Sequence, residues 1–232
     1  MFVNQRSYIY FPRPGLQNEW SAITAGVSAF ELNNQDIRLR GWVLNKDRPQ
    51  AIIYFGGNAE RVEANIPEFR TTFSYHSVYL VPYRGYGESE GTATEENLYS
   101  DALAIYDEVS RSHAEISVVG RSLGSGIATY LASVRKIDRL MLVTPFDSMV
   151  NLAREFYPLF PVGLLLIDQY DSASRVGQLD MQTLVVVAGN DEIVPGQNTE
   201  RVLSSVKPDH VTVKVIAQAK HNPIYTYSEY LI

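Results

Sequence analysis

Val118-Val119-Gly120-Arg121-Ser122-Leu123-Gly124-Ser125-Gly126 is the stretch that decides the fold, because it sets the pattern G-x-S-x-G between an apolar run and a segment of helical spacing. This context suits a serine on a sharp strand-to-helix turn. The positions two before and two after such a serine need almost no side chain, and Gly120 and Gly124 occupy them. We therefore expect the Ser122 hydroxyl to point out of the sheet, beside a helix N-terminus that favours developing negative charge.

The rest of the chain predicts a sheet around this turn. Short, nearly continuous apolar runs recur with helical periodicity between most of them, over residues 51–55, 78–83, 116–119, 140–143, 184–187 and 211–217. Runs that are apolar on both faces indicate parallel strands covered by helices on each side. The N-terminal part reads as antiparallel strands, over Tyr8–Phe11, Ala22–Phe30 and Ile37–Leu44. We predict an α/β fold with a mostly parallel, doubly wound sheet, antiparallel N-terminal strands and helices on both faces.

The clearest helix is expected to begin near Thr92, where Thr92-Ala-Thr-Glu95 fits a capping box. Further helices are expected over residues 59–73, 123–133, 149–156 and 196–206, with a short one after Asn222. The sequence has no internal repeat and no linker, so residues 1–232 are predicted to form one domain.

Segment 145–182 is the long connection between predicted strands, and it is more apolar than a plain crossover helix requires. Two interpretations stay open: ordinary core packing, or a small lid over the strand ends, where such sheets bind ligands. Phe146 and Phe160 of this segment are the candidate substrate-binding residues.

Composition excludes several classes of protein. The formal net charge of −6 without a Lys/Arg cluster argues against nucleic-acid binding. The lack of cysteine rules out disulfides, zinc–thiolate and iron–sulfur sites and a cysteine nucleophile. No signal-peptide pattern and no apolar run of roughly 18–20 residues occurs, so we expect a cytoplasmic protein without a membrane span.

A serine nucleophile needs a base, and the chain offers four histidines. His76 precedes a strand, His113 lies at the end of the capped helix, and His210 starts the last strand at its wrong end. His221 follows that strand and should emerge at the same sheet edge as Ser122. His221 is therefore the candidate base, against the alternative of an incidental surface histidine.

The carboxylate that orients the base should follow a strand between these two residues. Asp191 does so, after the run 184–187 and a turn. The order Ser122, Asp191, His221 is the one associated with α/β hydrolases. Asp147, which follows the preceding strand, remains the rival acid.

Two backbone N–H groups should stabilise an oxyanion. One is expected from Leu123, and the other from the loop 56–60, where Asn58 or Ala59 would present it. A dehydrogenase reading of the same glycines needs a Tyr-x-x-x-Lys pair, which the sequence lacks.

These residues resemble the serine α/β hydrolases, above all the cap-poor subgroup that includes protein depalmitoylases and serine-aminopeptidase-like bacterial proteins. The matching motifs are Tyr54-Phe55-Gly56-Gly57-Asn58-Ala59-Glu60, Tyr83-Arg84-Gly85-Tyr86-Gly87-Glu88-Ser89, Gly120-Arg121-Ser122-Leu123-Gly124, Asp191-Glu192-Ile193-Val194-Pro195 and His221-Asn222. The resemblance implies an acyl-enzyme mechanism with Ser122 as nucleophile, His221 as base and Asp191 orienting it. It also implies an oxyanion hole from the N–H groups of Asn58 and Leu123. The family usually has His-Gly where this chain has Gly56-Gly57.

The sequence thus favours a serine hydrolase acting on a small-molecule carboxylic ester or thioester, without metal or other cofactor. A serine aminopeptidase is one alternative, for which Glu60, Glu88 or Glu192 would hold the substrate amine. A non-catalytic binding protein of the same fold is the other. Arg84 and Arg121 are expected either to form structural ion pairs or to shape the charge of the pocket. The sequence predicts no oligomeric state.

Overall fold

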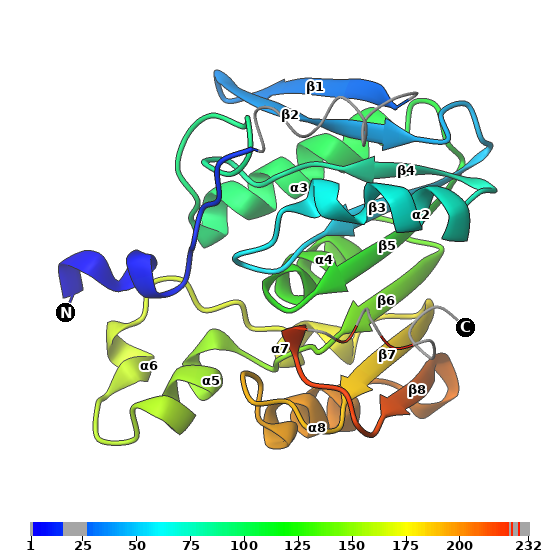
Figure 1. Cartoon of the computed structure of the whole chain (residues 1–232). Helices are drawn as coiled ribbons and strands as arrows, with labels where there is room; N and C mark the ends of the chain where they lie inside the picture. Colours follow the sequence, from blue (N-terminus) through cyan, green and yellow to red (C-terminus); the bar gives the residue numbers. More distant parts are fainter. Residues whose placement is uncertain (1, 16–26, 223, 225–226, 228–232) are drawn as a thin grey trace.

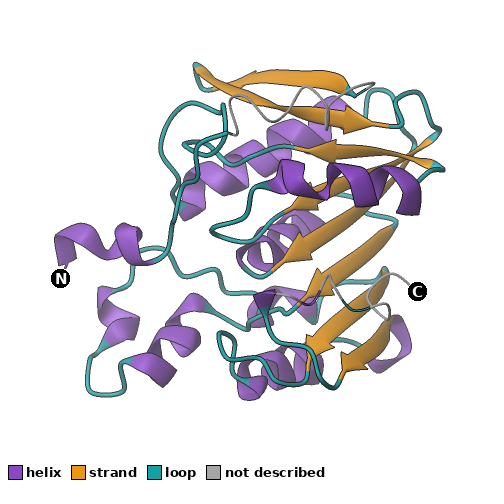
Figure 2. Ribbon diagram, in the orientation of Figure 1, coloured by secondary structure: helices purple, strands orange, loops and turns teal. Residues whose placement is uncertain are grey.

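The computed structural model describes residues 2–15, 27–222, 224 and 227. The strand expected over Ala22–Phe30 falls partly outside these ranges, and the helix expected after Asn222 falls almost entirely outside them. A mostly parallel sheet lies at the centre of the described part, and helices cover both of its faces (Figures 1 and 2). The predicted α/β architecture is confirmed.

The sheet has eight strands in the order β1-β2-β4-β3-β5-β6-β7-β8. β1 pairs with β2 and β2 with β4 in antiparallel register, and every other pair is parallel. The strands are β1 Ser28–Asn34, β2 Ile37–Leu44, β3 Gln50–Phe55, β4 His76–Leu80, β5 Glu115–Arg121, β6 Arg139–Val143, β7 Gln182–Ala188 and β8 Val211–Ile216.

The helices follow the strands along the chain. The α-helices are α2 Ile66–Thr72, α3 Glu95–Val109, α4 Leu123–Val134, α5 Met149–Phe156, α6 Val162–Leu165, α7 Ala173–Val176 and α8 Gly196–Ser205. The 3₁₀ helices are η1 Phe2–Tyr8, η2 Val62–Asn65 and η3 Pro208–His210.

Alternate residues of the central strands point into different cores, because successive side chains of a strand face opposite ways. Ile53 joins the main core with Leu98 of α3 and Ile127 of α4, whereas Ile52 joins a second core with Phe69 of α2. Both faces of the central strands are therefore covered, which explains why these runs are apolar throughout.

Three local predictions need correction. Tyr8–Phe11 is not a strand: η1 ends at Tyr8, and an extended loop follows. The cap of α3 is Thr94 rather than Thr92, because the Thr94 side chain accepts the Asn97 N–H. The helix expected over residues 59–73 is confined to η2 and α2.

The parallel strands direct their carboxyl ends to one edge of the sheet. In the sheet, β3 lies between β4 and β5. The chain continues from β3 to β4 on one side and from β5 to β6 on the other, so the loops after β3 and β5 turn away from each other. Ligands bind at such switch points in open α/β sheets. Ser122 and the loop 56–60 both lie at this place.

Candidate active site

Ser122 sits on a strained turn between β5 and α4. Its backbone has φ 51° and ψ −118°, a conformation that non-glycine residues rarely adopt. The flanking glycines allow this turn to lie against β3: a Cβ on Gly124 would stand 2.0 Å from the Phe55 carbonyl oxygen, and one on Gly120 would stand 2.4 Å from the Gly124 carbonyl oxygen. The glycine spacing of the motif is thus a steric requirement.

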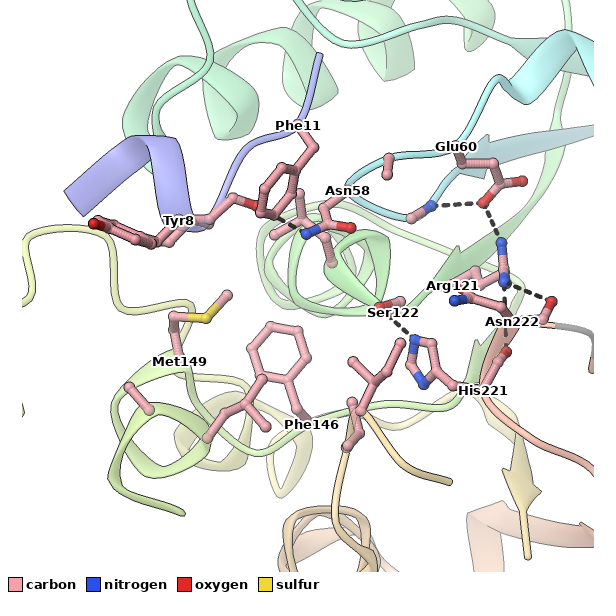
Figure 3. Close-up of a pocket in the computed structure, with 18 of the residues that line it drawn as sticks. Tyr8, Phe11, Asn58, Glu60, Arg121, Ser122, Phe146, Met149, His221 and Asn222 are labelled. Carbon is pink, nitrogen blue, oxygen red and sulfur yellow. Dashed lines mark hydrogen bonds and ion pairs between the residues drawn. The ribbon is translucent and has the colours of Figure 1, made fainter. Parts of the chain in front are cut away.

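The structure brings Ser122, His221 and Asp191 into one chain of contacts. The Ser122 Oγ lies 2.9 Å from His221 Nε2, and His221 Nδ1 lies 2.8 Å from Asp191 Oδ2. Figure 3 marks the contact between Ser122 and His221 with a dashed line. Asp191 Oδ1 accepts the N–H groups of Ile193 and Val194, which fix the carboxylate. With a proton on Nδ1 donated to Asp191, Nε2 is free to accept the Ser122 proton.

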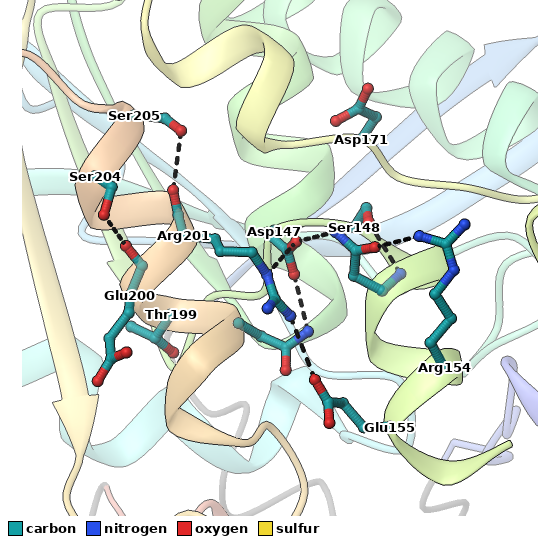
Figure 4. A network of polar contacts seen from close by, with 12 residues as sticks. Asp147, Ser148, Arg154, Glu155, Asp171, Thr199, Glu200, Arg201, Ser204 and Ser205 are labelled. Atoms are coloured by element: carbon teal, nitrogen blue, oxygen red, sulfur yellow. Dashed lines mark hydrogen bonds and ion pairs between the residues drawn. The ribbon is translucent and has the colours of Figure 1, made fainter. Parts of the chain in front are cut away.

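Asp147 does not contact His221 but belongs to a separate network (Figure 4). Its buried carboxylate accepts from the Asn198 side chain at 2.8 Å, from Arg201 Nε at 2.8 Å and from the Asn151 side chain. These contacts join the loop after β6 to α5 and α8. The arrangement favours a structural role for Asp147, whereas Asp191 is the carboxylate that contacts His221.

The other histidines have structural surroundings. His113 is buried, and its Nε2 lies 2.8 Å from the Tyr79 hydroxyl. His76 begins β4, and burial lowers its pKa, with the charge of Arg139 acting in the same direction. His210 ends η3, before β8, and so lies at the opposite end of that strand from His221.

The two expected oxyanion donors border the same space. Among the described residues, no acceptor is found for the N–H groups of Asn58 and Leu123, and both residues line the cavity that contains Ser122. The Gly57 N–H is already donated to Glu60 at 2.7 Å. The loop 56–60 is also fixed at Gly56, because the Gly56 carbonyl oxygen accepts from the Tyr83 hydroxyl and from the Gly124 N–H.

Glu60 and Arg121 form an ion pair beside this loop, with 2.7 Å between Oε2 and Nη1. Burial acts to raise the pKa of Glu60, but the Arg121 charge and hydrogen bonds from Gly57, Asn65 and Tyr54 outweigh it and hold this pKa below its usual value. Glu60 is therefore a carboxylate whose hydrogen-bonding capacity is already used. Arg84, by contrast, makes a buried pair with Asp101 and does not line the cavity.

Ser122 and His221 line a large cavity of about 1220 Å³. Phe146 is buried in its wall, while Phe160 is about half exposed at its rim. Most of the remaining apolar wall comes from α5, α6 and the N-terminal segment, through Tyr8, Ile9, Phe11, Met149, Leu152, Ala153, Phe156, Tyr157, Val162, Leu165 and Leu166. Segment 145–182 thus contributes one side of the cavity.

Sequence reasoning missed the opposite side of this cavity. Tyr8, Ile9 and Phe11 reach it because the N-terminal segment is tied to the loop after β3 and to α6. The Ile9 carbonyl oxygen accepts from the Asn58 side chain, and Gln5 donates to the Leu165 carbonyl oxygen. No motif marks such long-range contacts, so the sequence offered no signal for them.

The candidate acids of an aminopeptidase are otherwise engaged or peripheral. Glu60 is paired with Arg121, and Glu88 is paired with Arg40 on the surface. Glu192 is exposed and does not line the cavity. No specific contact therefore favours that alternative.

Two features of the described residues concern metals and membranes. No group of three or more His, Cys, Asp or Glu side chains in this part of the chain could hold a metal ion. Each helix in it is too short or too polar to cross a membrane.

Comparison with known proteins gives a consistent set of relatives, although no family model matches the chain. The uncharacterized protein Rv2307c of Mycobacterium tuberculosis is 32% identical over 219 residues, which cover 88% of this chain and 77% of that protein. The alpha/beta hydrolase domain-containing protein WAV2 of Arabidopsis thaliana is 23% identical, covering 97% of this chain and 79% of that protein. Among solved structures, the Pyrococcus furiosus esterase Pf2001 superposes with a TM-score of 0.73 at 17% identity, covering 95% of this chain and 94% of that one.

Proposed function

Because the chain belongs to the serine α/β-hydrolase superfamily, we propose that it hydrolyses carboxylic esters or thioesters through an acyl-enzyme intermediate. The observation that carries this proposal is the contact of His221 with Ser122 on one side and with Asp191 on the other, at 2.9 and 2.8 Å. The esterase activity named for the Pyrococcus furiosus protein is consistent with it.

Acylation begins at Ser122. Its Oγ attacks the carbonyl carbon of the substrate while His221 Nε2 takes the hydroxyl proton. Asp191 accepts from Nδ1 and stabilises the imidazolium that forms. When the tetrahedral intermediate collapses, the imidazolium gives its proton to the departing alkoxide or thiolate, and the acyl group stays on Ser122.

Deacylation repeats these steps with water. His221 removes a proton from a water molecule, whose oxygen attacks the acyl carbon, and the proton returns to Ser122 Oγ as the carboxylic acid leaves. In both halves, the N–H groups of Asn58 and Leu123 would donate to the oxyanion. Their lack of other acceptors in the described structure supports this assignment.

The apolar wall of the cavity supports an apolar acyl group on a small-molecule substrate. We assign Phe146 and Phe160 to the surface that contacts it, since both line the cavity. We also propose that residues 1–232 act as one domain and that segment 145–182 serves as a small lid, because α5 and α6 form one side of the cavity.

The test is labelling by a serine-directed phosphonate, followed by hydrolysis of a panel of ester and thioester pairs with graded acyl length. We expect the wild-type chain to be labelled and the Ser122→Ala variant to be unlabelled and inactive. A well-folded wild-type chain that resists labelling and hydrolyses none of the panel would contradict the proposal and favour a binding protein.

A further inference from the structure

Residues 156–167 form an uncharged segment beside the cavity, which we call the rim segment. Its sequence is Phe-Tyr-Pro-Leu-Phe-Pro-Val-Gly-Leu-Leu-Leu-Ile, and the Tyr157 hydroxyl is its one hydrogen-bonding side-chain group. It runs from the end of α5 through α6. Six of its large side chains are exposed to solvent, namely Phe156, Tyr157, Leu159, Phe160, Leu164 and Ile167. Contiguous exposed apolar surface on a folded domain marks an interaction site.

The exposure is greatest at Leu159, in the turn after α5, and at Leu164, in α6. Leu159 is 93% exposed and Leu164 is 86% exposed, and neither lines the cavity. The backbone that follows Leu164 is nevertheless anchored, because the Gln5 side chain donates to the Leu165 carbonyl oxygen and accepts the Ile167 N–H. These leucines are thus presented to solvent by a tethered segment.

The apolar surface continues across the opening of the cavity. Phe156, Tyr157 and Phe160 are exposed and also line the cavity, as do Tyr8 and Phe11 on its other side. Figure 1 shows η1, α5 and α6 together beyond the carboxyl ends of the strands, and Figure 3 places Tyr8 and Phe11 across the cavity from Phe146 and Met149.

We propose that this face, the rim segment with Tyr8 and Phe11, docks on the surface of a neutral lipid aggregate, a bilayer or micelle with uncharged or zwitterionic head groups. The proposal rests on the hydrolase function proposed above and adds the form in which the substrate is presented. Phenylalanine, tyrosine and leucine side chains on one face insert at the boundary between head groups and acyl chains.

Two observations favour this occupant over a protein. The rim segment carries no charge and almost no hydrogen-bonding side chain, so it offers a protein partner few directional contacts. A second copy bound over this face would cover the opening of the cavity, whereas a lipid surface would deliver an acyl chain into it.

Charge selects the type of surface. The chain has a formal net charge of −6, which opposes approach to an anionic bilayer. Apolar insertion is then the source of the attraction, and a neutral surface opposes it least.

The binding test uses the full chain with Ser122→Ala, so that lipid is not hydrolysed, and flotation with phosphatidylcholine vesicles. We expect the protein to float with these vesicles and to bind less when phosphatidylglycerol is included. Adding Leu159→Glu and Leu164→Glu should weaken binding at least tenfold. The matched control is Tyr75→Glu, because Tyr75 is 80% exposed and lies outside the cavity and the rim segment. This control should leave binding unchanged.

A second measurement separates docking from catalysis. With Ser122 restored, the Leu159→Glu/Leu164→Glu variant should hydrolyse a dispersed butyrate ester at the wild-type rate. It should lose the rate increase that we expect of the wild type when a longer ester forms micelles. If the wild type hydrolyses neither form, the proposed function fails, whereas the vesicle result still decides docking. No binding by the Ser122→Ala chain, equal binding by the glutamate variant, or a dimer dissociated by those glutamates would overturn the docking proposal.

Discussion

Arg121 and Glu60 form a buried ion pair that ties together the two loops on either side of Ser122. Glu60 accepts the Gly57 N–H of the loop after β3 at 2.7 Å. Arg121 donates to the Asn222 carbonyl oxygen at 3.2 Å and to that of His221 at 3.5 Å, in the loop after β8. The pair therefore holds both the loop 56–60, which carries the proposed oxyanion donor Asn58, and the loop of the candidate base His221, although it does not touch the Ser122 hydroxyl (Figure 3).

Glu60→Gln should damage both turnover and stability. The variant leaves the Arg121 charge buried, which costs about 3–5 kcal/mol of unfolding free energy. A displacement of His221 or of the oxyanion loop on the order of 1 Å lowers kcat by about 10²-fold. Urea unfolding measures the loss of stability, and esterase kinetics measure the fall in kcat. We expect KM for a short soluble ester to stay nearly unchanged.

The matched control for this change is Glu90→Gln. Glu90 pairs with Arg38 at 3.0 Å, but both side chains are about half exposed. Loss of such a surface pair costs at most about 1 kcal/mol. A folded Glu60→Gln variant with wild-type kcat would contradict the positioning role.

Asp191→Asn should lower turnover with little effect on stability, whereas Asp147→Asn should mainly lower stability. Asparagine at 191 disturbs the tautomer and charge stabilisation of His221, so kcat should fall by about 10⁴-fold while the unfolding free energy changes little. Asparagine at 147 removes a charge that Arg201 and Asn198 bind, which costs about 1.5–3 kcal/mol per charged hydrogen bond lost.

Kinetics and urea unfolding of the two purified variants provide the comparison. A loss of turnover in Asp147→Asn at wild-type stability, with Asp191→Asn fully active, would reverse the assignment of the acid.

The relation between Ser122, Asp191 and His221 could be anticipated from sequence because each follows a strand or strand-ending turn of a parallel sheet. Parallel strands bring their carboxyl ends to one edge, so strand order along the chain suffices to place these residues near one another. The contacts among them needed the structure, since spacing does not specify which way a loop side chain points.

The N-terminal segment shows where sequence patterns fail. Tyr8–Phe11 is rich in residues that favour strands, yet Tyr8 ends η1, and the loop after it packs against Asn58 and Tyr86 rather than pairing in the sheet. Asp168 binds both Arg6 and Tyr10 across more than 150 positions of sequence. Such contacts depend on tertiary packing that local propensity does not encode.

Gly124→Ala should prevent the native turn from forming. The added Cβ would lie 2.0 Å from the Phe55 carbonyl oxygen and 2.5 Å from its carbon, and neither backbone atom can move without breaking the pairing of β3 with β5. We expect a loss of about 3 kcal/mol or more in unfolding free energy, together with loss of phosphonate labelling.

Gly196→Ala is the control, because a Cβ there meets nothing within 4 Å and Gly196 begins α8. Its unfolding free energy should stay equal to that of the wild type or rise by up to about 1 kcal/mol. Equal stability of the Gly124→Ala and wild-type chains in urea would show that the turn between β5 and α4 tolerates a side chain at position 124.

Buried tyrosines should make the fold sensitive to alkali. Burial raises the pKa values of Tyr10, Tyr83, Tyr86, Tyr99 and Tyr170. The folded state then keeps these phenols protonated at a pH where the unfolded chain releases their protons. Their contribution to stability is complete below the unfolded pKa of about 10 and is lost as pH rises above it.

Urea unfolding at several pH values above about 9 measures this loss, which approaches about 1.4 kcal/mol per pH unit for each tyrosine that stays protonated only when folded. Tyr170→Phe removes one such phenol and should lower the slope by one proton, whereas Tyr75→Phe alters an exposed ring and should leave the slope unchanged. An unfolding free energy that is flat up to about pH 11 would mean that these phenols ionise equally in both states.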